Sequence, residues 1–186
     1  MLTATHSTTF STDSPRVARA ERLLDQVLVF NDLADSTPLL VEMGDEAYTA
    51  LLDELDAARL ALLDTHNGRL ANLAGDGALM LFPTTDAAIA FARAFNRVCD
   101  DLGIKSRTGV HLGDVMRRGN GDLAGVTVHA AARIESTAPA GEILVSAEAA
   151  AHSSATFARW GWVELKGLPG ATELMELVES SLAAAP

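Results

Sequence analysis

The sequence has little of what defines several common protein classes. It has a single cysteine, Cys99, among 186 residues, so no disulfide can form within the chain. It also has few basic residues, 14 Lys and Arg against 25 Asp and Glu, and the only adjacent basic pair is Arg117–Arg118. Binding along a phosphate backbone requires clustered positive charge, so the formal net charge of −11 argues against a nucleic-acid partner.

Long apolar runs are missing as well. No run approaches the roughly 20 residues needed to span a bilayer. The opening residues "MLTATHSTTFSTDSPR" lack the basic and apolar regions of a secretory signal. We therefore expect a soluble, cytoplasmic protein with no membrane partner. Aromatic residues make up 5% of a chain that is 48% hydrophobic, so the core should consist mainly of Leu, Val and Ala.

The length suits one domain with flanking tails. We expect residues 1–24 to form a flexible N-terminal tail with a short helix over "RVARAERLL", residues 25–179 to form the domain, and residues 180–186 to form a C-terminal tail. Cys99 lies in the amphipathic stretch "FARAFNRVCDDL", which predicts a buried thiol on a helix face.

The first half of the domain begins with an apolar strand, "DQVLVF" (25–30). A helix should follow with Thr37 as its N-cap and Pro38 at its first position. Gly44 should interrupt this helix, and Asn67–Gly68 should end its longer second part. The segments "RLANL" and "ALMLF" flank "AGDG", which is the strongest hairpin signal in the sequence.

The second half continues the alternation of helices and strands. A helix is predicted over "TDAAIAFARAFNRVCDDLG", two strands over "KSRTGVHL" and "DVMRR", a helix over "AGVTVHAAARIESTA", and strands over "GEILVS", "RWGWVELKG" and "TELMELV". The order is β-α-α-β-β-α-β-β-α-β and then a terminal β-hairpin. This order predicts an α+β fold with a mostly antiparallel sheet and helices packed on it.

Two aspartates stand where this pattern can bring them together. Asp32 ends the first strand and Asp76 lies at the tip of the hairpin. If the hairpin pairs beside the first strand, both carboxylates meet at one edge of the sheet, and they repel unless one is protonated or a cation lies between them. Such a pair suits one or two Mg²⁺ or Mn²⁺ ions, which take oxygen ligands and substrate phosphates. Gly75 and Gly77 would leave room for a close approach.

The stretch "LADSTP" adds a second element, because it leads into a helix N-terminus whose free N–H groups favour an anion. A nucleoside triphosphate bridged to Asp32 and Asp76 by metal would fit this arrangement. At this point the alternative is structural, with Asp76 only a turn residue and Asp35 only a helix cap.

Five motifs occur in an informative order: "VFNDLADST", "LAGDGALMLF", "RTGVHLGDV", "AGVTVHAAARIESTAPAGEILVS" and "ELKGLPG". In this order and spacing the chain resembles the catalytic domains of class III nucleotidyl cyclases, from about residue 27 to residue 178. The resemblance implies a palm-like (ferredoxin-like) domain and a homodimer. It also implies conversion of a nucleoside triphosphate to a 3′,5′-cyclic nucleotide with release of pyrophosphate.

The same resemblance implies roles for individual residues. Asp32, Asp76 and the backbone carbonyl of Leu33 would bind two Mg²⁺ or Mn²⁺ ions, which activate the ribose 3′-hydroxyl and clamp the triphosphate. Arg133 would stabilise the charge that develops at the reacting phosphate, and Lys166 would contact the triphosphate. The β- and γ-phosphates would lie in the backbone of Leu33, Ala34, Asp35, Ser36 and Thr37.

The chain departs from the family pattern at two positions. Asn72 stands where a base-selecting lysine is frequent, and an amide can both donate and accept. His129 stands where an asparagine usually orients the ribose. Asp122 matches the second base-selecting position, where an aspartate typically accepts a hydrogen bond from the 6-amino group of adenine. His111, in the predicted strand before a "GD" turn, is expected to be structural.

The leading hypothesis is therefore an adenylate cyclase, with ATP favoured by Asp122. Asn72 leaves GTP open as a substrate. Asn72 and His129 together also motivate a degenerate domain that binds nucleotide in a regulatory role. A dinucleotide cyclase is disfavoured, because Gly77 and Ala78 replace the Glu and Phe of the "GGDEF" signature. The acidic charge disfavours a polymerase-like palm, since it would repel a template.

Overall fold

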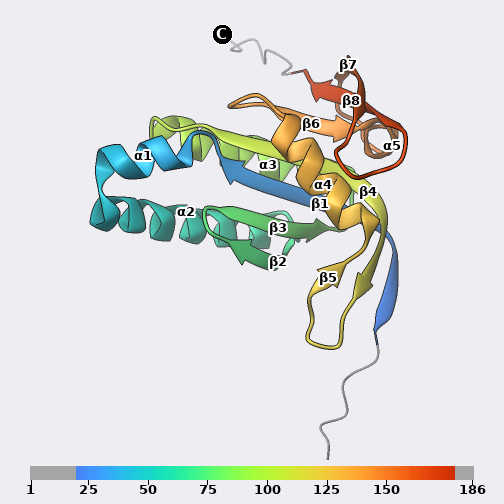
Figure 1. The fold of residues 1–186 in the computed structure, drawn as a ribbon, viewed down its shortest axis with the longest axis horizontal. Helices are drawn as coiled ribbons and strands as arrows, with labels where there is room; N and C mark the ends of the chain where they lie inside the picture. Colours follow the sequence, from blue (N-terminus) through green and yellow to red (C-terminus); the bar gives the residue numbers. More distant parts are fainter. Residues whose placement is uncertain (1–19, 179–186) are drawn as a thin grey trace, which may run out of the picture.

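One eight-stranded sheet organises the part of the chain that the computed structural model describes, residues 20–178 (Figure 1). The helices are α1 (Ser36–Met43), α2 (Asp45–Thr65), α3 (Thr85–Asp101), α4 (Val126–Thr137) and α5 (Ala147–Ala150). The strands are β1 (Glu21–Leu33), β2 (Arg69–Ala74), β3 (Gly77–Phe82), β4 (Ser106–Arg117), β5 (Leu123–Ala124), β6 (Ile143–Ser146), β7 (Phe157–Glu164) and β8 (Ala171–Leu177).

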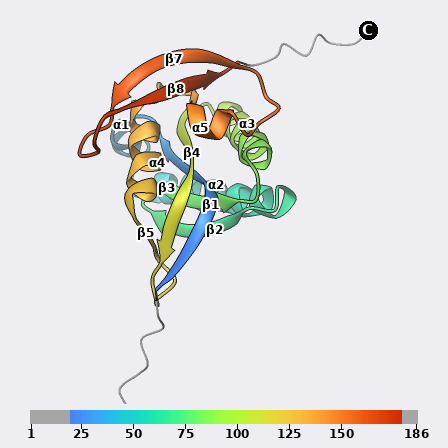
Figure 2. The same ribbon diagram turned by 90° about the vertical axis from the view of Figure 1, so that its right-hand side faces the viewer.

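The strand order is β2-β3-β1-β4-β6-β8-β7, with β5 paired to β4. Adjacent strands are antiparallel except β4 and β6, which are parallel. Figure 2 shows α4 on one face of the sheet and α2 and α3 on the other. The mostly antiparallel α+β fold is thus confirmed, and the "AGDG" hairpin pairs beside the first strand as the site hypothesis requires.

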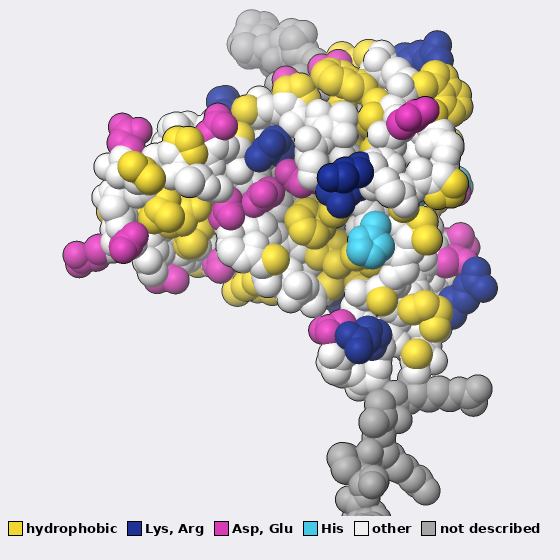
Figure 3. Space-filling view, in the orientation of Figure 1, with side chains coloured by type: hydrophobic (Ala, Val, Ile, Leu, Met, Phe, Trp, Pro, Cys, Tyr) yellow, Lys and Arg dark blue, Asp and Glu magenta, His cyan; other side chains and the backbone are white. Residues whose placement is uncertain are grey.

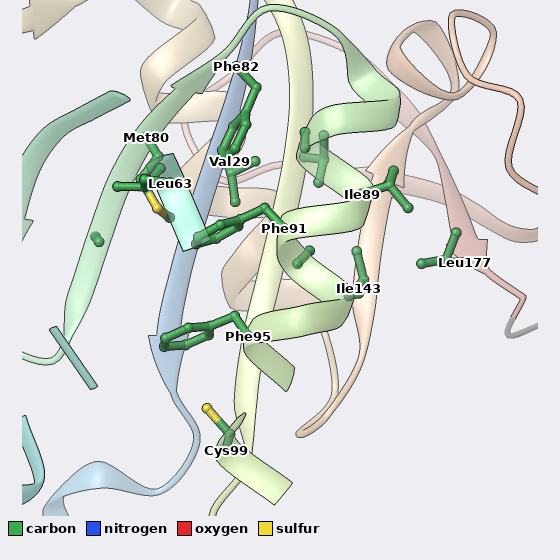
Figure 4. Packing of buried hydrophobic residues seen from close by; sticks show 14 of the residues in the cluster. Val29, Leu63, Met80, Phe82, Ile89, Phe91, Phe95, Cys99, Ile143 and Leu177 are labelled. Atoms are coloured by element: carbon green, nitrogen blue, oxygen red, sulfur yellow. The ribbon is translucent and has the colours of Figure 1, made fainter. Parts of the chain in front are cut away.

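The larger hydrophobic cluster fills the space between the sheet and helices α2 and α3 (Figure 4). Helix α3 begins with the Thr84 hydroxyl accepting from the Ala87 N–H at 3.1 Å, and apolar residues at helical spacing then face the sheet. The rings of Phe91 and Phe82 lie 5.0 Å apart, and those of Phe91 and Phe95 lie 6.0 Å apart. Cys99 is buried on the same helix face, as predicted.

Helix α4 covers the other face and approaches β4 unusually closely. A Cβ atom added to Gly109 would lie 2.3 Å from the backbone nitrogen of Glu135, and one added to Gly113 would lie 2.9 Å from the side chain of Thr127. The predicted "GD" turn at this point is wrong, because Gly113 lies inside one continuous strand, β4. This glycine serves the packing of α4 and not a reversal of the chain.

Other expectations need correction too. The predicted helix over residues 16–24 is not formed in its described part, because Glu21 opens β1 and pairs with Arg117 of β4; residues 16–19 and the C-terminal tail 180–186 lie outside the described residues. Helix α1 has Asp35 and not Thr37 as its N-cap. The short elements β5 and α5 were not predicted.

Candidate active site

Asp32 and Asp76 meet at one edge of the sheet. Strand β1 pairs with β3 so that Asn31 lies opposite Ala78, which places Asp32 beside the hairpin turn. A Cβ atom on Gly77 would lie only 3.1 Å from Asp32 Oδ1, so the absence of a side chain at Gly77 leaves space for the carboxylate. Within residues 20–178, the buried Asp76 Oδ2 has no hydrogen-bond partner. The end of β1 and the hairpin turn thus bring together two carboxylates that are partly shielded from water.

The face of the sheet on which the pair lies follows from strand alternation. Leu28 packs in the cluster that contains Ala131 of α4, whereas Val29 and Leu33 pack in the cluster with α2 and α3. Alternate residues of a strand share a face, so Asp32 faces the α4 side with Leu28.

Charged groups from β4 and α4 surround this pair. Arg107 lies opposite Asp32 in the register of β1 and β4, and its Nη2 is 3.5 Å from the carbonyl oxygen of Leu33. Its Nε is 3.7 Å from Oε1 of Glu135, a residue of α4 that is only 4% exposed. The acid pair, Arg107 and Glu135 therefore form one group of charges between the sheet and α4.

Burial and mutual repulsion shift the protonation of this group. Burial, repulsion from Asp76 and a side-chain hydrogen bond with Asp76, in decreasing order, raise the pKa of Asp32 to about 6. Burial and then repulsion from Asp32 raise the pKa of Glu135 to about 7, against the opposing effect of Arg107. Burial is the larger cause of both shifts and charge repulsion the smaller, and a bound cation would favour the ionised forms against both.

The donor set fits a divalent metal ion. It comprises two carboxylates at one turn, one buried Asp76 oxygen without a partner among residues 20–178, and the Leu33 carbonyl next in sequence. No group of three or more His, Cys, Asp and Glu side chains that could hold a metal occurs in the described part of the chain. A metal here would therefore complete its coordination with phosphate and water oxygens, as Mg²⁺ usually does.

The predicted phosphate cradle follows β1 directly. Ala34 donates its N–H to the carbonyl of Lys105 at 2.8 Å, and Asp35 adopts the left-handed conformation with φ 54°. Helix α1 then begins at Ser36. The first N–H groups of a helix have no intrahelical partner, and Pro38 carries none. The N–H groups of Ser36 and Thr37 are consequently the first-turn donors available to an anion.

The two base-selecting candidates line one pocket of about 330 Å³. Asn72 of β2 and Asp122 of the β4–β5 hairpin contribute its polar edge, and Phe30, Leu79 and Val128 are among its apolar residues. Asp122 already has partners, because Asn120 Nδ2 donates to its carboxylate at 2.6 Å and Arg118 Nη1 lies 3.6 Å from it. A nucleobase would have to compete with both groups.

His129 and Arg133 are not brought to the acid pair of their own chain. They lie one turn apart on the exposed side of α4, in line with Val126, which is also exposed. Figure 3 shows that this side of the molecule carries basic, acidic and hydrophobic side chains together. Lys166 is exposed in the turn between β7 and β8. His111 is structural in position, since its Nδ1 lies 2.9 Å from the Ser146 hydroxyl and burial lowers its pKa.

Sequence reasoning missed four residues around the pair: Arg59, Tyr48, Arg107 and Glu135. Arg107 and Glu135 stand inside two of the motifs quoted above, so their position next to Asp32 could have been suspected. Arg59 and Tyr48 lie on the buried side of α2. Burial and then repulsion from Asp76 raise the pKa of the Tyr48 phenol, which places this ring near the pair. A core position in a helix gives no sequence signal of such proximity.

The fold and the acid pair together define a palm-type α+β domain with a polar site at one edge of its sheet. Residues 20–178 match the family described as the adenylate and guanylate cyclase catalytic domain, and the chain belongs to this family. The resemblance noted from the five motifs is therefore confirmed.

Comparison with individual proteins agrees with this assignment. The chain is 30% identical over 126 residues to an adenylate cyclase of Glutamicibacter nicotianae, covering 67% of this chain and 31% of that protein. It is 36% identical over 116 residues to the putative adenylate cyclase 3 of Rhizobium meliloti, covering 58% of this chain and 20% of that protein. The chain thus spans between a fifth and a third of the length of these relatives.

Solved structures share the fold. The adenylyl cyclase CyaB from P. aeruginosa superposes with a TM-score of 0.79 at 22% identity, covering 90% of this chain and 100% of that one. The guanylate cyclase domain of RhGC from Catenaria anguillulae, in complex with GTP, gives a TM-score of 0.76 at 21% identity, covering 85% and 98%. Among residues 20–178, no helix combines the length and the apolar character needed to cross a membrane.

Proposed function

We propose that this chain is an adenylate cyclase domain, which converts ATP to 3′,5′-cyclic AMP and pyrophosphate at sites shared by a homodimer. The observation that supports this most is the acid pair, with an Asp76 oxygen that is buried and without a partner among the described residues, in a domain of the cyclase family. The family assignment supports the reaction class, and Asp122 supports the choice of ATP.

In this proposal each group of the chain has a defined task. Asp32, Asp76 and the Leu33 carbonyl hold two Mg²⁺ or Mn²⁺ ions, which supply Lewis-acid activation of the ribose 3′-hydroxyl and of the phosphates when bound. The backbone of residues 33–37 receives the β- and γ-phosphates at the N-terminus of α1. Arg107, which projects beside Asp32, adds a permanent positive charge at the phosphate end.

The remaining groups act on the nucleoside and on the transition state. Asn72 and Asp122 of the second chain receive the base in the pocket they line, where the Asp122 carboxylate accepts a hydrogen bond from the adenine amino group. His129 of the second chain orients the ribose. Arg133, contributed by the second chain, donates to the phosphate oxygens that gain charge as the 3′-oxygen attacks the α-phosphorus and pyrophosphate leaves. Lys166 contacts the triphosphate.

A guanylate or relaxed-specificity cyclase is the second candidate, and Arg118 favours it. Arg118 lines the same pocket as Asn72, with its Nη1 3.6 Å from the Asp122 carboxylate. Both groups can donate hydrogen bonds, and the O6 and N7 atoms of guanine are acceptors that arginine binds well. The pocket therefore offers donors to guanine as well as an acceptor to adenine.

Product analysis tests the proposal. The purified chain is incubated separately with ATP, GTP, CTP and UTP, with Mg²⁺ and with Mn²⁺, and the products are identified by mass. Formation of 3′,5′-cyclic AMP without cyclic GMP supports the adenylate cyclase, whereas cyclic GMP, alone or together with cyclic AMP, supports the second candidate. Nucleotide binding without any cyclic product would contradict both and indicate a degenerate binding domain.

A further inference from the structure

Beneath the acid pair, α2 places an arginine in the hydrophobic core. Arg59 is only 2% exposed, although arginine is rarely buried to this degree. It points to the face of the sheet opposite α4, among the residues that α2 and α3 pack against β1 and β3. The guanidinium lies 4.9 Å from the ring centroid of Phe95, a residue seen in Figure 4 within this cluster.

Two hydrogen bonds define what this guanidinium holds. Nη1 donates to the Asp56 carboxylate one turn earlier on α2. Nη2 donates across 3.2 Å to the backbone carbonyl oxygen of Asp76, at the tip of the β2–β3 hairpin. The first bond stays within the helix. The second joins α2 to the residue whose carboxylate meets Asp32.

The energetic balance indicates that Arg59 is more than a core filler. The ion pair of Arg59 has only one buried member, because the Asp56 side chain is 38% exposed. Burying a charge for such a pair is often no more stabilising than well-packed apolar residues of similar volume. The Arg59 Nε also lacks a hydrogen-bond partner among residues 20–178, which adds a further cost of burial. An apolar residue would fill the space without these costs, but it could not bind the Asp76 carbonyl.

We infer that Arg59 is a positioning residue, which fixes the Asp76 peptide from below and so aims the Asp76 carboxylate at Asp32. The β2–β3 turn is only two residues long, Gly75 and Asp76, and Gly75 adopts φ 65°. Gly75 and Gly77, on either side of Asp76, carry no side chains that could hold it in place by packing. With its carbonyl bound to the buried guanidinium, the Asp76 peptide has one orientation, and its carboxylate is held beside Asp32.

This inference rests on the proposed metal role of Asp32 and Asp76, but it makes a separate claim about the turn itself. Residues that orient metal ligands typically change metal affinity by about ten- to hundredfold when they are removed. The metal-free turn should also move more freely without Arg59. The two effects can be measured separately, one with metal and one without.

The experiment compares the full chain with the variants Arg59→Met, Arg59→Lys and Arg59→Gln. Leu63→Val serves as the matched control, because it weakens the core from the same face of α2 without touching Asp76. Mn²⁺ binding is measured by calorimetry on each variant, at a temperature below every unfolding transition. Amide hydrogen exchange at residues 75–77 is measured by NMR in metal-free protein.

We expect Arg59→Met to weaken Mn²⁺ binding by about ten- to hundredfold and to accelerate exchange at residues 75–77, whereas Leu63→Val changes neither. If Arg59→Met does not fold, the other two variants decide: Arg59→Lys retains a donor that can reach the carbonyl and should bind Mn²⁺ more tightly than Arg59→Gln, which is shorter. Equal affinity and equal exchange across the folded variants would overturn the inference. Wild-type protein that binds no Mn²⁺ would instead refute the proposed metal site, and the exchange comparison would still decide the role of Arg59.

Discussion

Arg133 and Glu135 lie two residues apart on α4 and point to opposite sides of the helix. Glu135 is buried against Arg107 and the acid pair, whereas Arg133 is exposed on the outer surface. Successive helix residues are separated by about 100°, so positions two apart diverge by roughly 200°. An arginine in this position is directed away from the Asp32 and Asp76 of its own chain and is available to a second copy.

This relationship predicts complementation between two inactive variants. Neither Asp32→Ala nor Arg133→Ala homodimers should turn over. Mixed together, they form heterodimers with one doubly damaged site and one intact site. Random mixing should restore up to about a quarter of the wild-type activity, since half of the dimers are mixed and each has one intact site of two. Co-expression followed by a product assay checks this. Absence of recovery despite demonstrated subunit exchange would indicate a site built within one chain.

Removal of either acid should abolish turnover without unfolding the protein. Asp32→Ala and Asp76→Ala each remove one of two close carboxylates, so the metal-free protein should keep or raise its melting temperature while losing the metal site. Circular dichroism melts and a cyclase assay measure both effects. Asp53→Ala, which removes an exposed carboxylate elsewhere on α2, is the control. Full activity in either site variant would refute the metal assignment.

The choice of base should respond to position 72. Asn72→Lys would bring an ammonium group to the pocket that Asn72 and Asp122 line. It would approach the ring nitrogen that accepts a hydrogen bond in adenine but carries hydrogen in guanine. We expect the ATP-to-GTP ratio of kcat/KM to rise roughly tenfold, which corresponds to about 1.4 kcal/mol. An unchanged ratio would show that residue 72 does not face the base.

The contribution of Asp32 and Glu135 to the stability of the metal-free protein should fall as pH rises from about 4 to about 7. The folded-state pKa values of Asp32 and Glu135 are raised, to about 6 and about 7. A carboxyl whose pKa is raised by folding binds its proton more tightly in the folded state, so the protonated forms favour folding and ionisation opposes it. Thermal melts of the wild type, Asp32→Asn and Glu135→Gln should be recorded across this range. The melting temperature should decline less steeply with pH in both variants than in the wild type.

Mn²⁺ should reverse this loss near pH 7, because the cation neutralises the charge that opposes folding. The same addition should stabilise Asp32→Asn much less. Asp53→Asn should follow the wild type with and without metal. Parallel curves for the wild type and Glu135→Gln would show that this carboxyl is ionised equally in the folded and unfolded states.

Most of the element order and the location of the acid pair follow from the amino-acid sequence. The prediction used local signals: the alternation of predicted strands and helices, the Gly44 break and the two-residue turn in "AGDG". Each of these signals comes from residues that are close together in the chain. Asp32 and Asp76 were predicted to meet because only one assumption was needed, the pairing of the hairpin with the first strand. That pairing is the one observed.

The remaining features depend on which surfaces pack together in the folded chain, and no local sequence pattern encodes that packing. Gly113 resembles a turn residue in the sequence, but its role comes from Thr127 of a helix that crosses β4. The N-cap is Asp35 and not the predicted Thr37. The Ala34 N–H donates a hydrogen bond to the Lys105 carbonyl, and this bond fixes where the chain leaves the sheet. Arg59 shows the limit most clearly: a single basic residue within a helix has no local pattern that could reveal the carbonyl 17 residues away to which it donates.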